Sequence, residues 1–301
     1  MAGSNTKSAI IYALVANSAI AGAKLLAALV TGSSAMLAEG IHSIADAANQ
    51  VLLLIGIKRS RRPPDDQHPL GYGKTIYVWS FIVAIVLFSL GGMYSLNEGW
   101  HKLSDPQPLA WPWLAISILV FAIIAEGISL RKAIIEINKV RGDRSLWRWF
   151  RESRASELVV IFGEDVAAEM GLLLALAAVA MTMLTGNPVY DALGTLAIGL
   201  LLVVIALLIG VEVKALLIGE STDPQDIKKM RIFIGNRPEI EDLLNLLTIQ
   251  LGHDVMVSAK LKMQKVDSAT DLVAAINRFE VDFKQAFPQV VWLFVEPDIQ
   301  V

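Results

Sequence analysis

Residues 37–50 read LAEGIHSIADAANQ and lie inside a long apolar segment of the chain. The stretch carries His42 and Asp46, which are four residues apart and therefore project from the same face of a helix. An imidazole nitrogen and a carboxylate on one face supply half of a tetrahedral site for a divalent metal ion. Because an ionisable residue inside a membrane is costly, the pair predicts a functional site. The alternative is a buried His–Asp hydrogen bond between packed helices.

The composition indicates a polytopic membrane protein. Hydrophobic residues make up 54% of the chain, and the mean hydropathy of +0.54 is too apolar for an ordinary soluble protein. The net charge of −3 suggests no nucleic-acid partner. Because cysteine is absent, disulfides, thiolate ligands and thiol nucleophiles are excluded, and any metal site must use His and carboxylates.

Six apolar segments predict six transmembrane helices. Their approximate ranges are 9–30, 35–57, 76–99, a fourth that begins near residue 111, then 158–184 and 189–218. Most loop Lys and Arg residues follow the second and fourth segments, so the positive-inside rule predicts that both termini are cytoplasmic. The short polar start has neither a signal peptide nor an Arg-rich transit peptide, which favours the inner membrane of a bacterial cell.

Residues 1–219 are predicted to form the membrane domain and residues 220–301 a cytoplasmic α+β domain. Thr222-Asp223-Pro224 is typical of a helix start, strands are expected at 240–251, 255–263 and 290–295, and an amphipathic helix precedes the last strand. The order αββαβ predicts a two-layer domain with an antiparallel sheet. About eighty residues make a thin core, which favours packing against a second copy.

The fifth segment carries a second polar cluster, GEDVAAE at residues 163–169. Asp165 and Glu169 share a helix face, and Glu164 lies about 100 degrees around the helix from Asp165. Carboxylates in an apolar helix cannot face lipid, so this helix and the second one are expected to meet at a shared metal site. The alternative is a set of hydrogen bonds between helices.

The chain resembles the cation diffusion facilitators, the family of zinc transporters. The resemblance rests on the His42 and Asp46 pair, the basic loop, the tail order, and the stretches EGIHS at 39–43, HPLGYG at 68–73 and GNPVYD at 186–191. The family's usual pair on the fifth span is incomplete, because Asp165 matches one member and Ile161 stands at the other. The Glu164-Asp165 doublet instead resembles the branch that contains the mitochondrial human zinc transporter.

This resemblance implies efflux of a divalent cation in exchange for protons by a homodimer in the lipid bilayer. Zinc is the first expectation and manganese, cobalt or iron the alternatives, with no cofactor besides the transported ion. The expected ligands are His42, Asp46 and Asp165, with Glu164 or Glu169 as the fourth. Supporting or gating roles are assigned to four further residues, each of which a structural hydrogen bond would equally explain: Glu39, Asn49, Glu126 and Asp191.

Two further metal sites of the family are incomplete in this sequence. In the loop, Asp65 and His68 remain but Tyr72 stands where a second His would lie, so the two residues are expected to order the loop. In the tail, Phe294 replaces the usual His, which predicts that the domain dimerises by packing instead of through a metal cluster.

The competing class is a membrane scaffold or regulator that keeps this fold without transporting an ion. Its polar residues would serve only as hydrogen bonds between helices, and it would tolerate Asp46→Asn. A membrane enzyme is not predicted, because the chain shows neither a nucleophile–base arrangement nor a phosphate-binding loop.

Overall fold

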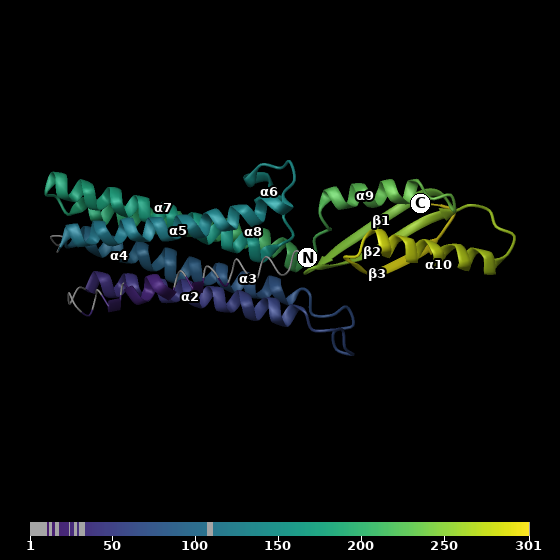
Figure 1. Cartoon of the computed structure of the whole chain (residues 1–301), viewed down its shortest axis with the longest axis horizontal. Coiled ribbons are helices and arrows are strands. Elements are labelled where there is room, and N and C mark those ends of the chain that lie inside the picture. The colour runs from purple at the N-terminus through teal and green to yellow at the C-terminus, as the bar shows by residue number, and fades with distance from the viewer. Residues whose placement is uncertain are drawn as a thin grey trace. The chain divides into compact units, whose positions relative to one another are not determined.

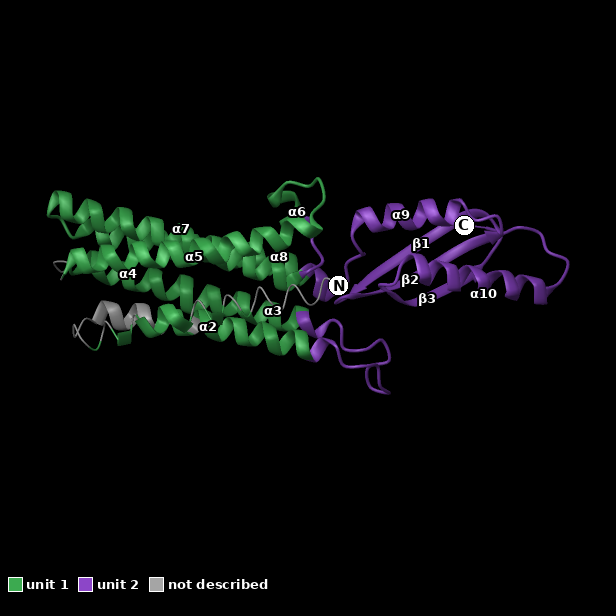
Figure 2. Ribbon diagram, viewed as in Figure 1, with its two compact units in different colours: residues 1–58, 77–151, 156–214 green, residues 59–76, 152–155, 215–301 purple. Residues whose placement is uncertain are grey.

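Figure 1 shows the computed structural model of the 301-residue chain. The structure describes residues 34–106 and 111–300, together with scattered positions between residues 11 and 29. The side chains of residues 34–42 and of Ala45 also lie outside the description. The chain divides into two compact units (Figure 2): a helical unit of residues 1–58, 77–151 and 156–214, and a mixed unit of residues 59–76, 152–155 and 215–301.

The helical unit consists of long helices that run alongside one another (Figure 1). In chain order they are α2 (Ser34–Ser60), α3 (Thr75–Val86), the π-helical η1 (Leu87–Met93), α4 (Tyr94–Ser104), α5 (Pro112–Val140), the short α6 (Leu146–Glu152), α7 (Ser156–Thr185) and α8 (Val189–Ile218). Helices α3, η1 and α4 form one continuous helix.

Within the described residues, four helices are long and apolar enough to cross a membrane. They are Thr75–Ser104, Pro112–Val140, Ser156–Thr185 and Val189–Ile218. These helices confirm that the protein is a multi-pass helical membrane protein. The predicted second span coincides with α2, whereas the predicted first span falls largely on residues outside the description.

Glycines let the Thr75–Ser104 helix approach α8 closely. A Cβ atom at Gly92 would lie 2.6 Å from a methyl group of Val203, and one at Gly199 would lie 2.7 Å from the backbone nitrogen of Leu96. Gly92 belongs to η1, where the wider π-helical turn interrupts an otherwise regular helix. Small residues at such a contact allow the close backbone packing on which helix association in membranes depends.

The mixed unit contains the predicted order of helices and strands. It comprises α9 (Pro224–Gly235), β1 (Ile240–Leu251), β2 (Asp254–Met263), α10 (Ala269–Ala286) and β3 (Val290–Pro297). The helix start was predicted correctly, because Asp223 caps α9 by accepting a hydrogen bond from the backbone N–H of Gln225, and Pro224 occupies the first helical position.

The expectation of an antiparallel sheet was wrong. The sheet has the order β1-β2-β3, and β2 pairs with β1 in antiparallel fashion but with β3 in parallel fashion. The reason is the connection: a tight turn joins β1 to β2, whereas α10 crosses over between β2 and β3 and returns the chain in the same direction.

The core of the mixed unit lies between this sheet and its two helices. Val257, Ala259 and Leu261 of β2 are fully buried, and aromatic rings from α9 and α10 pack in the same cluster. Phe283 contacts three other rings, with centroids 5.7 Å from Phe233, 5.5 Å from Phe279 and 4.8 Å from Phe287. The burial of Phe279 and Phe283 in this cluster accounts for the amphipathic pattern of the sequence that forms α10.

The segment 59–76 joins the mixed unit through a close backbone contact. A Cβ atom at Gly73 would lie 2.0 Å from the carbonyl oxygen of Leu251, and Gly252 beside it adopts a positive φ of 70° in the β1–β2 turn. Glycine at both positions therefore allows two backbones to meet where a side chain would clash. Arg154 of the segment 152–155 similarly pairs with Glu220 at 2.9 Å.

Candidate metal-binding site

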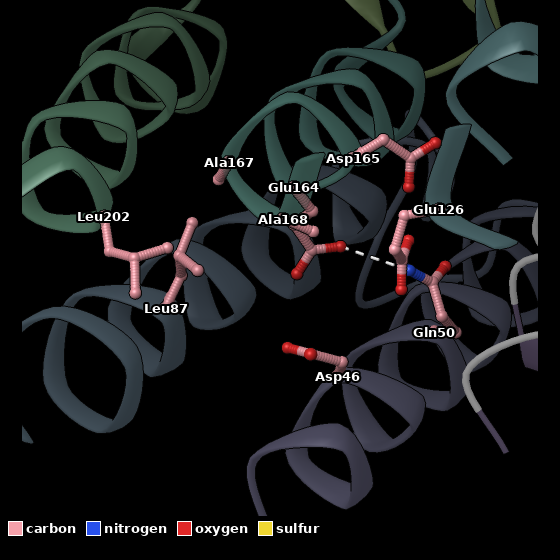
Figure 3. A pocket seen from close by; sticks show the side chains of 9 residues that line it. All are labelled: Asp46, Gln50, Leu87, Glu126, Glu164, Asp165, Ala167, Ala168 and Leu202. Carbon is pink, nitrogen blue, oxygen red and sulfur yellow. Dashed lines mark hydrogen bonds between the residues drawn. The ribbon is translucent and has the colours of Figure 1, made fainter. Parts of the chain in front are cut away.

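A small cavity of about 30 Å³ lies inside the helical unit. Figure 3 shows its lining, which comes from α2, η1, α5, α7 and α8. The lining residues are Asp46, Gln50, Leu87, Glu126, Glu164, Asp165, Ala167, Ala168 and Leu202. Four of the nine are carboxylates, contributed by three different helices. The structure thus brings together Asp46, Glu164 and Asp165, as the sequence predicted, and adds Glu126 to them.

Glu164 is held by two neighbouring amides of α2. The Asn49 amide nitrogen donates to Oε1 of Glu164 at 2.9 Å, and the Gln50 amide nitrogen donates to Oε2 at 3.2 Å. Both amides lie within one helical turn of Asp46, so they share its side of α2. The second helix therefore contributes a carboxylate to the cavity and also orients a carboxylate of α7.

Asp165 and Glu126 are the buried carboxylates of the α5–α7 interface. Asp165 is 4% exposed, and its Oδ2 accepts a hydrogen bond from the Ser129 hydroxyl at 3.2 Å. Glu126 is 9% exposed and lies one turn from Ser129 on α5. Carboxylates buried in an apolar bundle require compensation by protons or by a cation, and the cavity offers room for one.

Glu169 occupies a different position from the other predicted ligands. It does not line the cavity, although it is four residues beyond Asp165 on α7. Its two carboxylate oxygens face Gly127 of α5, at 3.8 and 3.9 Å from the place where a Cβ atom would lie. Because Glu164 lines the cavity beside Asp46 and Glu169 does not, Glu164 is the better candidate for the fourth ligand.

The remaining predicted site residues divide into two groups. The side chains of Glu39 and His42 lie outside the described residues. Asp191 does not line the cavity and instead pairs with Lys102, whose Nζ lies 3.2 Å from Asp191 Oδ2.

Within the described part of the chain, no three His or carboxylate groups are close enough to hold one ion.

Asp65 and His68 order the loop that follows α2. The Asp65 carboxylate accepts hydrogen bonds from the Tyr72 hydroxyl at 2.6 Å and from the His68 backbone N–H at 2.8 Å, and the His68 and Tyr72 rings lie 4.2 Å apart. The bond from Tyr72, followed by that from the His68 backbone, lowers the pKa of Asp65. Tyr72 stands where the resemblance led us to expect a second His. Its hydrogen bond occupies an Asp65 oxygen that a metal ion would need.

The sequence alone did not single out Gln50 or Ser129, and it gave Glu126 only a supporting role. Gln50 follows Asp46 by four residues, so its presence on the same helix face is a signal that was available. The placement of Ser129 and Glu126 depends on how α5 rotates against α7, which local periodicity does not determine.

Residues 10–218 match the family model of the cation efflux transmembrane domain. The chain is 37% identical over 232 residues to the mitochondrial proton-coupled zinc antiporter SLC30A9 of Xenopus laevis, a match that covers 76% of this chain and 41% of that protein. It is 34% identical over 226 residues to metal tolerance protein C4 of Arabidopsis thaliana, covering 74% of this chain and 49% of that protein.

A shorter match links the chain to a transporter of another ion. The manganese efflux system protein MneP of Bacillus subtilis (strain 168) is 40% identical over 77 residues, which is 26% of each protein. The present chain spans about two fifths of SLC30A9 and about half of the Arabidopsis protein. The match over residues 10–218 covers most of the chain, and it shows that the protein belongs to the cation efflux family, the cation diffusion facilitators, whose members are transporters and not enzymes.

Proposed function

We propose that the protein exports a divalent metal cation, zinc first, in exchange for protons. The observation that carries the proposal is the cavity lined by Asp46, Glu126, Glu164 and Asp165, which lies between α2 and helices that are long and apolar enough to span a membrane. Carboxylates bind metal only when they are ionised, so protons and metal compete for the same oxygens. This competition couples the two fluxes when the cavity opens alternately to either side.

The ligands proposed for the ion are Asp46, Asp165, Glu164 and His42. Asp46 and Asp165 supply oxygens from α2 and α7, and His42 precedes Asp46 by one helical turn in the sequence. Zinc is favoured because the relative SLC30A9 is a zinc antiporter, and manganese is the alternative because the relative MneP is a manganese efflux protein. The carboxylate-rich lining also suits manganese, cobalt or iron as alternative ions.

The membrane topology proposed is six spans with both termini in the cytoplasm. The helix α2 and the segment 9–30 would be the second and first spans, residues 1–219 the membrane domain and residues 220–301 the cytoplasmic domain. The basic loops after α2 and α5 support this orientation. The cell membrane is the proposed location. The relative SLC30A9 is mitochondrial, so localisation of the tagged chain would distinguish the cell membrane from a mitochondrial membrane.

The test is metal uptake by liposomes that contain the purified protein and an internal zinc dye. With an acidic interior, zinc is expected to enter as protons leave, and one pH unit supplies about 1.4 kcal/mol per exchanged proton. Uptake should collapse when an ionophore dissipates the pH gradient, and Asp46→Ala should abolish it. If the wild-type protein moves neither zinc nor manganese, cobalt or iron, the transporter proposal fails and the scaffold alternative stands.

We also propose that the transporter is a homodimer whose sheets pack against each other. In the mixed unit, Ile249, Met256 and Trp292 face one another across the three strands, on the side opposite the buried Val257. Leu247 and Phe294 on the same face are 61% and 52% exposed. An apolar face of this kind, uncovered within its own unit, is typical of a protein interface.

Replacing Phe294 by Lys is expected to weaken this dimer. A charge on the apolar face would be desolvated on association, so the dissociation constant should rise by about tenfold or more. Light scattering of the full-length protein in detergent would measure the shift toward monomer across a dilution series. Val281→Lys, which alters an exposed residue of α10, is the control, and an equal shift in both variants would contradict the proposed interface.

A further inference from the structure

Gln50 and Asn49 are uncharged polar residues of α2 whose side chains bond to the carboxylate cluster. Gln50 is 1% exposed and Asn49 is 2% exposed, so both amides are fully inside the helical unit. Each donates its nitrogen to one oxygen of Glu164. An amide that donates through its nitrogen retains a carbonyl oxygen that can accept a hydrogen bond or ligate a cation.

These carbonyl oxygens have no partner in the described structure. Asn49 Oδ1 and Gln50 Oε1 are both buried, and no donor among the described residues reaches either of them. Buried acceptors in native proteins are nearly always satisfied, so an ion or a water molecule is the expected partner. Gln50 is the amide that lines the cavity, beside Asp46 and Glu164 (Figure 3).

We propose that Gln50 is a specificity-determining residue of the transport site, and that its carbonyl oxygen binds the transported ion. This proposal rests on the transport function proposed above. The amide nitrogen of Gln50 keeps Glu164 in place, while the carbonyl oxygen adds a neutral ligand to the carboxylates of the cavity. A carboxylate has about four lone-pair sites, so Glu164 accepts both amide bonds and still has capacity for a cation.

The consequence concerns the class of ion. The ligating side chains that line the cavity in the described structure all offer oxygen: Asp46, Gln50, Glu126, Glu164 and Asp165. Oxygen ligands suit hard cations such as manganese, whereas imidazole and sulfur ligands favour zinc. A site that combines these oxygens with the single imidazole proposed from His42 should accept manganese as well as zinc. The carbonyl oxygen of Gln50 raises its selectivity for manganese over zinc.

Gln50→Met tests the proposal, because methionine has a similar length but replaces the hard amide oxygen by a soft thioether and removes the donor to Glu164. Full-length protein in liposomes with an acidic interior would be assayed for zinc and manganese uptake, and the ratio of Vmax/KM for manganese to that for zinc calculated. The wild-type protein should transport both ions. In the variant this ratio should fall by about tenfold or more, since a soft ligand disfavours manganese.

A second variant and a control keep the test decisive. Leucine is compatible with an apolar helix but has no oxygen to ligate an ion. Gln50→Leu should therefore also lower the ratio of manganese to zinc transport. Thr182→Val removes another buried polar group, whose hydroxyl donates to the Ala178 carbonyl of its own helix, and should leave the ratio unchanged. An unchanged ratio in both Gln50 variants would overturn the proposal, as would a wild-type protein that moves zinc but not manganese. A wild-type protein that moves cobalt or iron but neither zinc nor manganese would overturn it too, whereas one that moves none of the four ions would instead refute the proposed function.

Discussion

Replacement of Asp165 by Asn is expected to reduce metal transport by about 100-fold or more, which corresponds to the loss of about 3 kcal/mol of binding in the transport cycle. The substitution preserves the size of the side chain and its acceptor for Ser129, but it removes the negative charge and one of the two ligating oxygens. Asp165 lines the cavity and is 4% exposed, so the lost charge belongs to the buried wall of the proposed site. Initial rates of zinc uptake in liposomes measure the effect.

Glu169→Gln is the matched control for this experiment. Glu169 lies on the same helix four residues farther on, and it does not line the cavity. Its neutralisation is expected to leave at least about half of the wild-type rate, because the Glu169 side chain is not part of the cavity wall that would hold the ion. If both variants lose transport equally, the ion passes along this face of α7 as a whole, and the assignment of the site to the cavity is wrong.

The positions of Asp46, Glu164 and Asp165 could be predicted because each is a charged residue in an apolar helix. Burial away from lipid leaves few places for such groups, so the two polar clusters were expected to meet, and they do. Gln50 is neutral, and its position one turn after Asp46 places it on the same helix face without distinguishing a ligand from a structural amide. Its significance depends on the bond to Glu164, which is formed between residues 114 positions apart.

The π-helical segment η1 and the parallel pairing of β3 show a different limit of sequence reasoning. Residues 87–93 read LFSLGGM and contain no proline or charge, so the sequence predicts one uninterrupted helix there. The direction of β3 depends on the end of the sheet to which α10 returns the chain, and the helical connection between β2 and β3 was the available signal for parallel pairing. Strand patterns identify which residues are buried, but they carry no information about the direction of pairing.

The second large effect is expected in the mixed unit, where Phe283→Ala should reduce the free energy of unfolding by about 4 kcal/mol. Phe283 is fully buried and contacts Phe233, Phe279 and Phe287, so truncation leaves a cavity that these rings cannot fill without moving. A domain of about eighty residues has a total stability of only about 4–12 kcal/mol. The loss of one ring would therefore remove a third or more of that stability.

Proteolysis of the full-length protein in detergent, across a series of urea concentrations, would measure this change, because protease cleaves the mixed unit only where it has unfolded. Val281→Ala, at a 66% exposed position of the same helix, should stay within about 0.5 kcal/mol of wild type. A similar midpoint for Phe283→Ala and wild type would show that the aromatic cluster does not form the core. Zinc uptake by the Phe283 variant adds a second result: retained transport would show that the helical unit carries the ion without a stable tail, as expected if the cavity residues alone bind it.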